Sequence, residues 1–176
     1  SGKLYADIAK AHRMPQVVIL AGGLGTRLGE IAEKVPKSLI EVDGKPMLSH
    51  ILEWAQSQGC MDALILTGHL GEHFDGFTHQ GMALNFHRET EPLGTGGALW
   101  HAKEHLQNEF ILLWGDDFHP IDYNKLVSLH RRESSKITMT VTESHEDMNL
   151  LHQDGRVTAY DKSENKPENF NGYEAG

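Results

Sequence analysis

The sequence has only one cysteine, Cys60, and it has no long apolar run. A single cysteine excludes a disulfide within the chain and is typical of a protein kept in the reducing cytoplasm. No stretch approaches the roughly 18 apolar residues that a membrane-spanning helix requires, and the N-terminus lacks the basic and then apolar layout of a signal peptide. We therefore expect a cytoplasmic protein that does not bind membranes.

Positive charge is also scarce, because 16 lysine and arginine residues stand against 25 acidic residues, for a formal net charge of -9. This balance argues against nucleic acid as a partner, and an anionic ligand would need local donors, a few cations or a metal ion. The 176 residues are enough for one domain with a sizeable core, since 39% of them are apolar. Self-association into a homo-oligomer stays open.

Apolar, β-branched runs alternate with amphipathic segments along the chain. Strands are predicted at 16–21, 62–67, 82–89, 110–115, 136–142 and 156–161, with a short extended piece at 38–42; helices are predicted at 46–58, 71–77, 97–107 and 123–132. This order predicts an α/β fold, a Rossmann-like and mostly parallel sheet with helices on both faces. Ser1 and Gly2 are typical of a tag remnant, so residues 1–14 are expected to be a remnant or extension and residues 15–176 the domain.

The glycine-rich segment AGGLGTRLGEIAEKVPK, residues 21–37, follows the first predicted strand. A P-loop is excluded because the Lys-Ser pair at 37–38 follows a proline, and the dinucleotide fingerprint fails because Leu28 stands where its third glycine should be. A third interpretation is a loop that wraps a nucleoside triphosphate. Successive backbone N–H groups can bind phosphate oxygens, and Arg27 and Lys37 would supply positive charge. Both this loop and the Gly-Asp-Asp at 115–117 follow predicted strands, where ligands bind in parallel sheets.

The motif GGLGTRL, followed by Pro-Lys at 36–37, resembles the sugar-1-phosphate nucleotidyltransferases. EPLGTGGAL (91–99), GDD (115–117) and YDK (160–162) extend the resemblance, in the family's order, over residues 15–176. It implies an enzyme of the EC 2.7.7 class, in which a sugar 1-phosphate oxygen attacks the α-phosphorus of a nucleoside triphosphate and releases pyrophosphate. Because the nucleophile is already an anion, catalysis needs positioning and charge neutralisation rather than a general base.

The resemblance also favours a substrate pair. EPLGTGGAL is most similar to the guanylyltransferases that act on D-glycero-D-manno-heptose and mannose 1-phosphates, so GTP is the favoured nucleotide and GDP-heptose or GDP-mannose the type of product. A uridylyltransferase for another sugar 1-phosphate remains an alternative. A second alternative is a regulatory homologue that binds nucleotide-sugars without turnover. Loss of Arg27 or Lys37 would favour that alternative, but both residues are present.

Roles for individual residues come from the resemblance. Arg27 and Lys37 would be catalytic cations on the phosphates, and Asp116 would bind Mg²⁺ as the cofactor. The residues expected to bind the nucleotide are Ala21, Gly22, Gly23, Gly25, Thr26, Glu91 and Gly96, with 94–97 forming a second glycine loop. The residues expected to bind the sugar phosphate are Gly97, Asp161, Lys162 and Glu174.

This sequence departs from the family's pattern in three respects. Asp161 stands where the family has Glu, and Glu174 stands where it usually has Asn. Family members continue past this point into strands with a second metal-binding aspartate, so we expect the 176-residue chain to be C-terminally incomplete. The pairs His69/His73 and His101/His105 have the i, i+4 spacing that places two imidazoles on one helix face, but a solvated face is favoured over a zinc site because no third ligand stands at a telling distance.

Overall fold

The computed structural model describes residues 13–23, 34–163, 167 and 169–175, and the chain divides into two compact units, Ser1–Val127 and Ser128–Gly176. In the part of the chain so described, no helix is long and apolar enough to cross a membrane. Each unit is described below by itself. The boundary between them falls within one helix, α4 (Tyr123–Glu133).

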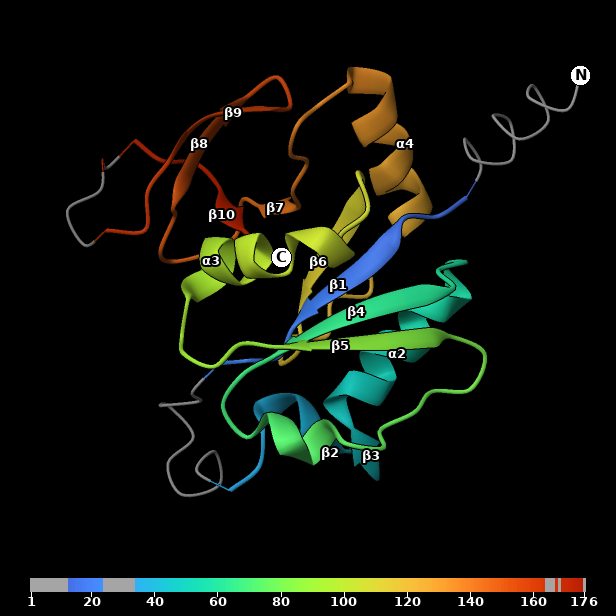
Figure 1. Cartoon of the computed structure of the whole chain (residues 1–176). Helices are drawn as coiled ribbons and strands as arrows, with labels where there is room; N and C mark the ends of the chain where they lie inside the picture. Colours follow the sequence, from blue (N-terminus) through green and yellow to red (C-terminus); the bar gives the residue numbers. More distant parts are fainter. Residues whose placement is uncertain (1–12, 24–33, 164–166, 168, 176) are drawn as a thin grey trace, which may run out of the picture. The chain divides into compact units, whose positions relative to one another are not determined.

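The first unit is built on a four-stranded sheet with all neighbouring strands parallel (Figure 1). Its strands are β1 (Gln16–Leu20), β4 (Asp62–Thr67), β5 (Ala83–Arg88) and β6 (Phe110–Trp114), in the order β5-β4-β1-β6. The chain therefore builds outward from β1 to β5 on one side and then returns to the other side of β1 with β6. All four strands lie within one or two residues of their predicted bounds.

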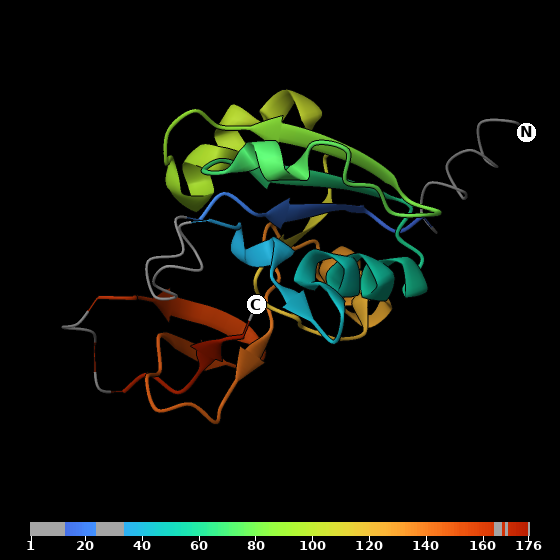
Figure 2. The ribbon, with the colours of Figure 1, turned by 90° about the horizontal axis from the view of Figure 1, so that it is seen from below.

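Alternate residues of the strands enter two separate cores, one on each face of the sheet. On one face Val17 and Ile19 pack with α2 (Met47–Ser57) and with Tyr123 and Val127 of α4. On the other face Val18 packs with residues of α3 (Gly94–His101) and the segment after it. Figure 2 shows α2 and α3 on opposite sides of the sheet. The predicted α/β fold with helices on both faces is thus confirmed.

The connections of the first unit differ in detail from the prediction. The segment at 38–42, expected to be extended, begins instead as a 3₁₀ turn, η2 (Lys37–Leu39), before the small hairpin of β2 (Glu41–Val42) and β3 (Lys45–Pro46). The helix expected at 71–77 is a 3₁₀ turn, η3 (Gly71–Phe74), and the helix expected at 97–107 starts earlier and is divided into α3 and η4 (Lys103–His105). The expectation of a glycine loop at 94–97 is therefore wrong, because these residues form the first turn of α3.

The second unit contains two antiparallel strand pairs. β8 (Leu150–Gln153) and β9 (Arg156–Tyr160) form a hairpin whose two-residue turn, Asp154 and Gly155, has positive φ at both positions. β7 (Val141–Thr142) pairs with β10 (Tyr173–Glu174). The strand predicted at 136–142 is therefore only two residues long, and neither β8 nor β10 was predicted.

Candidate functional site

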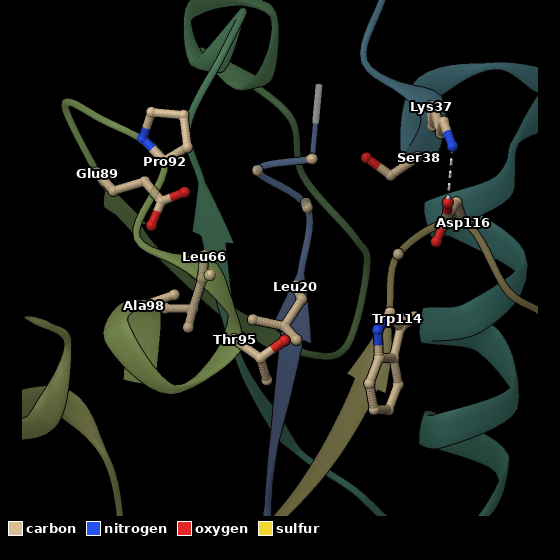
Figure 3. A pocket seen from close by; sticks show the side chains of 15 residues that line it. Leu20, Lys37, Ser38, Leu66, Glu89, Pro92, Thr95, Ala98, Trp114 and Asp116 are labelled. Atoms are coloured by element: carbon tan, nitrogen blue, oxygen red, sulfur yellow. Dashed lines mark hydrogen bonds and ion pairs between the residues drawn. The ribbon is translucent and has the colours of Figure 1, made fainter. Parts of the chain in front are cut away.

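A cavity of about 450 Å³ lies at the carboxyl ends of β1 and β6 (Figure 3). The chain places β4 on one side of β1 and β6 on the other, so this is the point at which the strand order reverses, the usual ligand site of open parallel sheets. The residues that line it come from the ends of all four strands, from η2 and from the start of α3: Leu20, Ala21, Gly22, Gly23, Lys37, Ser38, Leu66, Glu89, Pro92, Gly94, Thr95, Ala98, Trp114, Gly115 and Asp116.

Two glycines of the lining are required by close backbone packing. A Cβ on Gly22 would lie 3.0 Å from Oε1 of Glu89 and 3.2 Å from the backbone nitrogen of Gly68. A Cβ on Gly115 would lie 3.0 Å from the carbonyl oxygen of Leu20. A Cβ on Gly23, by contrast, would meet no atom of the described residues within 4 Å, so among these residues its backbone is open to a ligand.

Lys37 and Asp116 face each other across one side of the cavity. Lys37 Nζ lies 3.4 Å from Asp116 Oδ2, and both side chains remain partly exposed. Lys37 opens η2, whereas Asp116 follows β6 by two residues, so the parallel sheet brings together charges that are 79 positions apart in sequence. The ammonium group can bind a phosphate and the carboxylate can bind a metal ion.

Asp116 has the chemistry that Mg²⁺ requires of a protein in such a site. Mg²⁺ is usually held by one or two carboxylates, with substrate phosphates and water completing its shell, rather than by an all-protein cage. In the described ranges there is no group of three or more His, Cys, Asp or Glu side chains that could hold a metal ion by itself. A single carboxylate beside a lysine ammonium group therefore suits a metal that arrives with a phosphate-bearing ligand.

The first turn of α3 supplies backbone donors to the cavity. Gly94 and Thr95 line it, and the residue before the helix, Leu93, offers no side-chain cap. The N–H groups of a helical first turn have no partner within the helix, so they can bind an anion or another acceptor. A Cβ on Gly96 would meet no atom within 4 Å, whereas one on Gly97 would lie 2.7 Å from Cβ of Leu93. Neither Gly96 nor Gly97 is among the lining residues.

Glu89 is a cavity residue that the sequence interpretation missed. It directly follows β5, and Figure 3 shows its carboxylate turned toward the cavity. Burial raises the pKa of Glu89 against the opposing influence of His101 and the backbone of Leu93, and its Oε2 is buried without a hydrogen-bond partner in the described structure. The predicted nucleotide-binding acid, Glu91, is exposed and does not line the cavity. An acid within two residues of the end of a parallel strand, as at Asp116, was the signal that could have identified Glu89.

The predicted sugar-phosphate residues Lys162 and Glu174 meet in the second unit. Lys162 Nζ lies 2.7 Å from Glu174 Oε2, and the hydroxyl of Tyr160 also donates to this oxygen. The hydrogen bonds to Glu174 and Tyr160 raise the pKa of Lys162. Burial acts to raise the pKa of Glu174, but the hydrogen bonds from Lys162 and Tyr160 outweigh it and lower that pKa. Asp161 instead accepts a hydrogen bond from the backbone N–H of Ser163, at 2.7 Å.

Neither histidine pair lies on a single helix. His69 precedes η3, and His101 and His105 belong to α3 and η4. His101 and His105 converge instead on His87 of β5, with His87 Nε2 2.9 Å from His101 Nδ1 and ring centroids 4.8 and 5.0 Å apart. Burial and these two neighbours lower the pKa of His87.

Of the predicted nucleotide-binding and catalytic residues, the structure brings Ala21, Gly22, Gly23 and Lys37 to the same cavity as Asp116. Gly25, Thr26 and Arg27 lie outside the described residues. These five residues surround one space at a single sheet edge, so one ligand could contact them together, whereas the predicted residues Glu91 and Gly96 do not line it.

The nucleotidyl transferase family model matches residues 16–150 of the chain. D-glycero-alpha-D-manno-heptose 1-phosphate guanylyltransferase of Campylobacter jejuni is 35% identical over 136 residues, which are 74% of this chain and 59% of that protein. UTP–glucose-1-phosphate uridylyltransferase AglF of Haloferax volcanii is 30% identical over 132 residues, 73% of this chain and 54% of that protein. The chain therefore spans little more than half the length of these relatives.

A solved structure with a similar fold is that of HddC from Yersinia pseudotuberculosis, complexed with GMP-PN. It matches with a TM-score of 0.64 and 29% sequence identity, over 80% of this chain and 65% of that one.

Proposed function

Because this chain belongs to the nucleotidyl transferase family, we propose that it provides the nucleotide-binding part of an enzyme that transfers a nucleoside monophosphate from a nucleoside triphosphate to a sugar 1-phosphate. The observation that carries the proposal is the cavity at the ends of β1 and β6, where Lys37, Asp116 and open glycine backbone surround one space. A triphosphate requires such a set of donors and charges.

In the proposed reaction an oxygen of the sugar 1-phosphate forms a bond to the α-phosphorus. The bond from that phosphorus to the bridging oxygen of the β-phosphate breaks, and pyrophosphate leaves with the electron pair. Lys37 neutralises phosphate charge, and the backbone at Gly22 and Gly23 binds phosphate oxygens. Arg27 is proposed to act on the departing pyrophosphate. Mg²⁺, when bound by Asp116 and the phosphates, would withdraw negative charge from the reacting group.

We propose GTP as the nucleotide, with a heptose or mannose 1-phosphate as the acceptor. The relative from Campylobacter jejuni is a guanylyltransferase by name, and HddC was solved with GMP-PN. Glu89 supports the same choice, because a carboxylate that lines the cavity with its buried Oε2 unpartnered can accept hydrogen bonds from the two neighbouring donors of guanine, N1–H and the 2-amino group. Adenine, uracil and cytosine lack this pair of donors.

The test is a screen for pyrophosphate release and for nucleotide binding, with GTP, UTP, CTP and ATP and with mannose, heptose and glucose 1-phosphates. GTP should bind more tightly than the other nucleotides, and Glu89→Gln should reduce this preference because the amide would present an N–H₂ group to a guanine donor. Preference for another nucleotide would reject guanylyl transfer, and binding without pyrophosphate release would show that this chain supplies nucleotide binding without turnover. Failure to bind any of the four nucleotides would reject the proposed function altogether.

A further inference from the structure

Ser38 is a buried polar residue in the wall of the cavity with no partner for its hydroxyl. Its relative exposure is 2%, and its Oγ has no hydrogen-bond partner in the described structure. Ser38 belongs to η2, directly after Lys37, and Figure 3 shows its hydroxyl pointing into the cavity, toward the segment that follows β1. A buried hydroxyl without a partner is costly, so native structures rarely contain one unless it has another role.

The position of Ser38 is fixed by close packing against the end of β6. A Cβ on Gly115 would lie 3.1 Å from Cβ of Ser38, so the two residues are in near contact and only small side chains suit both positions. The backbone N–H of Leu39 donates to the carbonyl of Pro36 at 2.8 Å, which closes the turn around Ser38. The hydroxyl is therefore held at the cavity wall and cannot easily turn toward bulk water.

From this geometry we infer that Ser38 is a substrate-binding residue whose hydroxyl donates a hydrogen bond to a phosphate oxygen of the nucleotide in the cavity. The inference rests on the proposed function, because it takes a nucleoside triphosphate as the ligand. The neighbours of Ser38 favour an anionic partner: the ammonium group of Lys37 is next in the chain, and the open backbone at Gly23 lines the same space. A hydroxyl beside these donors adds a neutral donor for the same charge.

Ser38→Ala tests the inference because it removes the hydroxyl without removing any internal hydrogen bond. The melting temperature of the variant should equal or exceed that of the unsubstituted chain. Its affinity for GTP, measured calorimetrically in the presence of Mg²⁺, should fall by roughly 10-fold or more, the usual effect of losing a hydrogen bond to a charged group. Its affinity for guanosine, which has no phosphate, should not change.

Two further variants act as controls. Ser38→Cys retains the shape of the side chain but is a weaker donor, so its affinity for GTP should lie between those of the other two proteins. Ser57→Ala removes a hydroxyl that donates to the carbonyl of Trp54 within α2, outside the cavity lining, and should leave GTP affinity unchanged.

Three results would overturn the assignment of Ser38. The first is a GTP affinity of Ser38→Ala within twofold of that of the unsubstituted chain. The second is a loss of guanosine affinity in Ser38→Ala equal to its loss of GTP affinity. The third is a lower melting temperature of Ser38→Ala, which would reveal an internal partner for the hydroxyl. If the unsubstituted chain binds neither GTP nor any of the other three nucleotides, the proposed function fails and the assignment of Ser38 fails with it. A normal GTP affinity that is insensitive to Ser38 rejects the assignment alone.

Discussion

Gly96 is predicted to weaken the helix α3 while leaving space for the ligand. It is the third residue of α3, its φ is not positive, and a Cβ built there meets no atom within 4 Å. An alanine can therefore take the same backbone conformation without strain. Within a helix, replacing glycine by alanine stabilises the folded state by about 0.5–1 kcal/mol. Gly96→Ala should raise the free energy of unfolding by about this amount and the melting temperature by about 1–4 °C.

Nucleotide binding should change in the opposite direction. Gly96 does not line the cavity itself, but it directly follows Thr95, which does, and the family resemblance predicts that Gly96 contacts the nucleotide. A methyl group in that space would displace the ligand or force it to shift, which costs about 1–3 kcal/mol in close-packed sites and corresponds to a loss of affinity of roughly 5- to 150-fold. Urea denaturation and titration calorimetry with GTP measure the two effects on the same protein.

Gly97→Ala is the matched control in the same turn of α3. Its Cβ would lie 2.7 Å from Cβ of Leu93, so the gain in helix stability should be offset by a clash and the melting temperature should not rise. If Gly96→Ala raises the stability and binds GTP as tightly as the unsubstituted chain, the ligand does not approach Gly96. A lower stability for Gly96→Ala would contradict the open space that the structure shows there.

Three other perturbations have definite expected results. Gly115→Ala places a Cβ 3.0 Å from the backbone oxygen of Leu20, so it should lower the free energy of unfolding by about 1–3 kcal/mol in urea denaturation; unchanged stability would contradict the close approach. The pKa of His87 is lowered in the folded state from its ordinary 6.5, so as the pH falls the unfolded chain binds the proton first and the free energy of unfolding decreases. His87→Gln should therefore flatten the pH dependence of the free energy of unfolding between pH 7 and 5. An equally steep dependence in the variant would contradict the lowered pKa. Burial raises the pKa of Cys60 to about 12, so at pH 8 a thiol reagent should modify it only in urea, and rapid modification of the native chain would refute its burial.

The strands of the first unit could be predicted because their sequences carry one unambiguous signal. Three of the four runs, QVVIL, DALILT and FILLW, are apolar apart from the terminal residues Gln16, Asp62 and Thr67, because central strands of a parallel sheet are covered on both faces. The same signal predicted where the ligand site lies, because the carboxyl ends of parallel strands meet at one edge. The position of the site could therefore be predicted without knowing the conformation of the loops.

The start of α3 could not be predicted because local preference and tertiary context disagree. Gly94, Gly96 and Gly97 all disfavour a helix, yet they form its first turn, where Leu93 packs closely over Gly97. The two short strands β8 and β10 carry little apolar pattern, and each is formed by pairing with a partner strand rather than by its own composition. Glu91 was predicted because it opens the motif EPLGTGGAL, whereas Glu89 was placed inside the strand predicted at 82–89. Because β5 ends at Arg88, Glu89 instead follows the strand and reaches the cavity.

The charges of the cavity, like the net charge of -9 of the whole chain, would oppose the binding of a triphosphate unless further positive charge is supplied. Among the described lining residues, Lys37 is the one cation, whereas Glu89 and Asp116 are both acids. The lysine is moreover engaged with Asp116 at 3.4 Å, so a phosphate must compete with a carboxylate for it. A divalent cation that binds Asp116 would remove this competition and release Lys37 for the phosphate. The metal proposed for Asp116 and the arginine proposed at position 27 are therefore parts of the same requirement, since the backbone donors around Gly22 carry no net charge of their own.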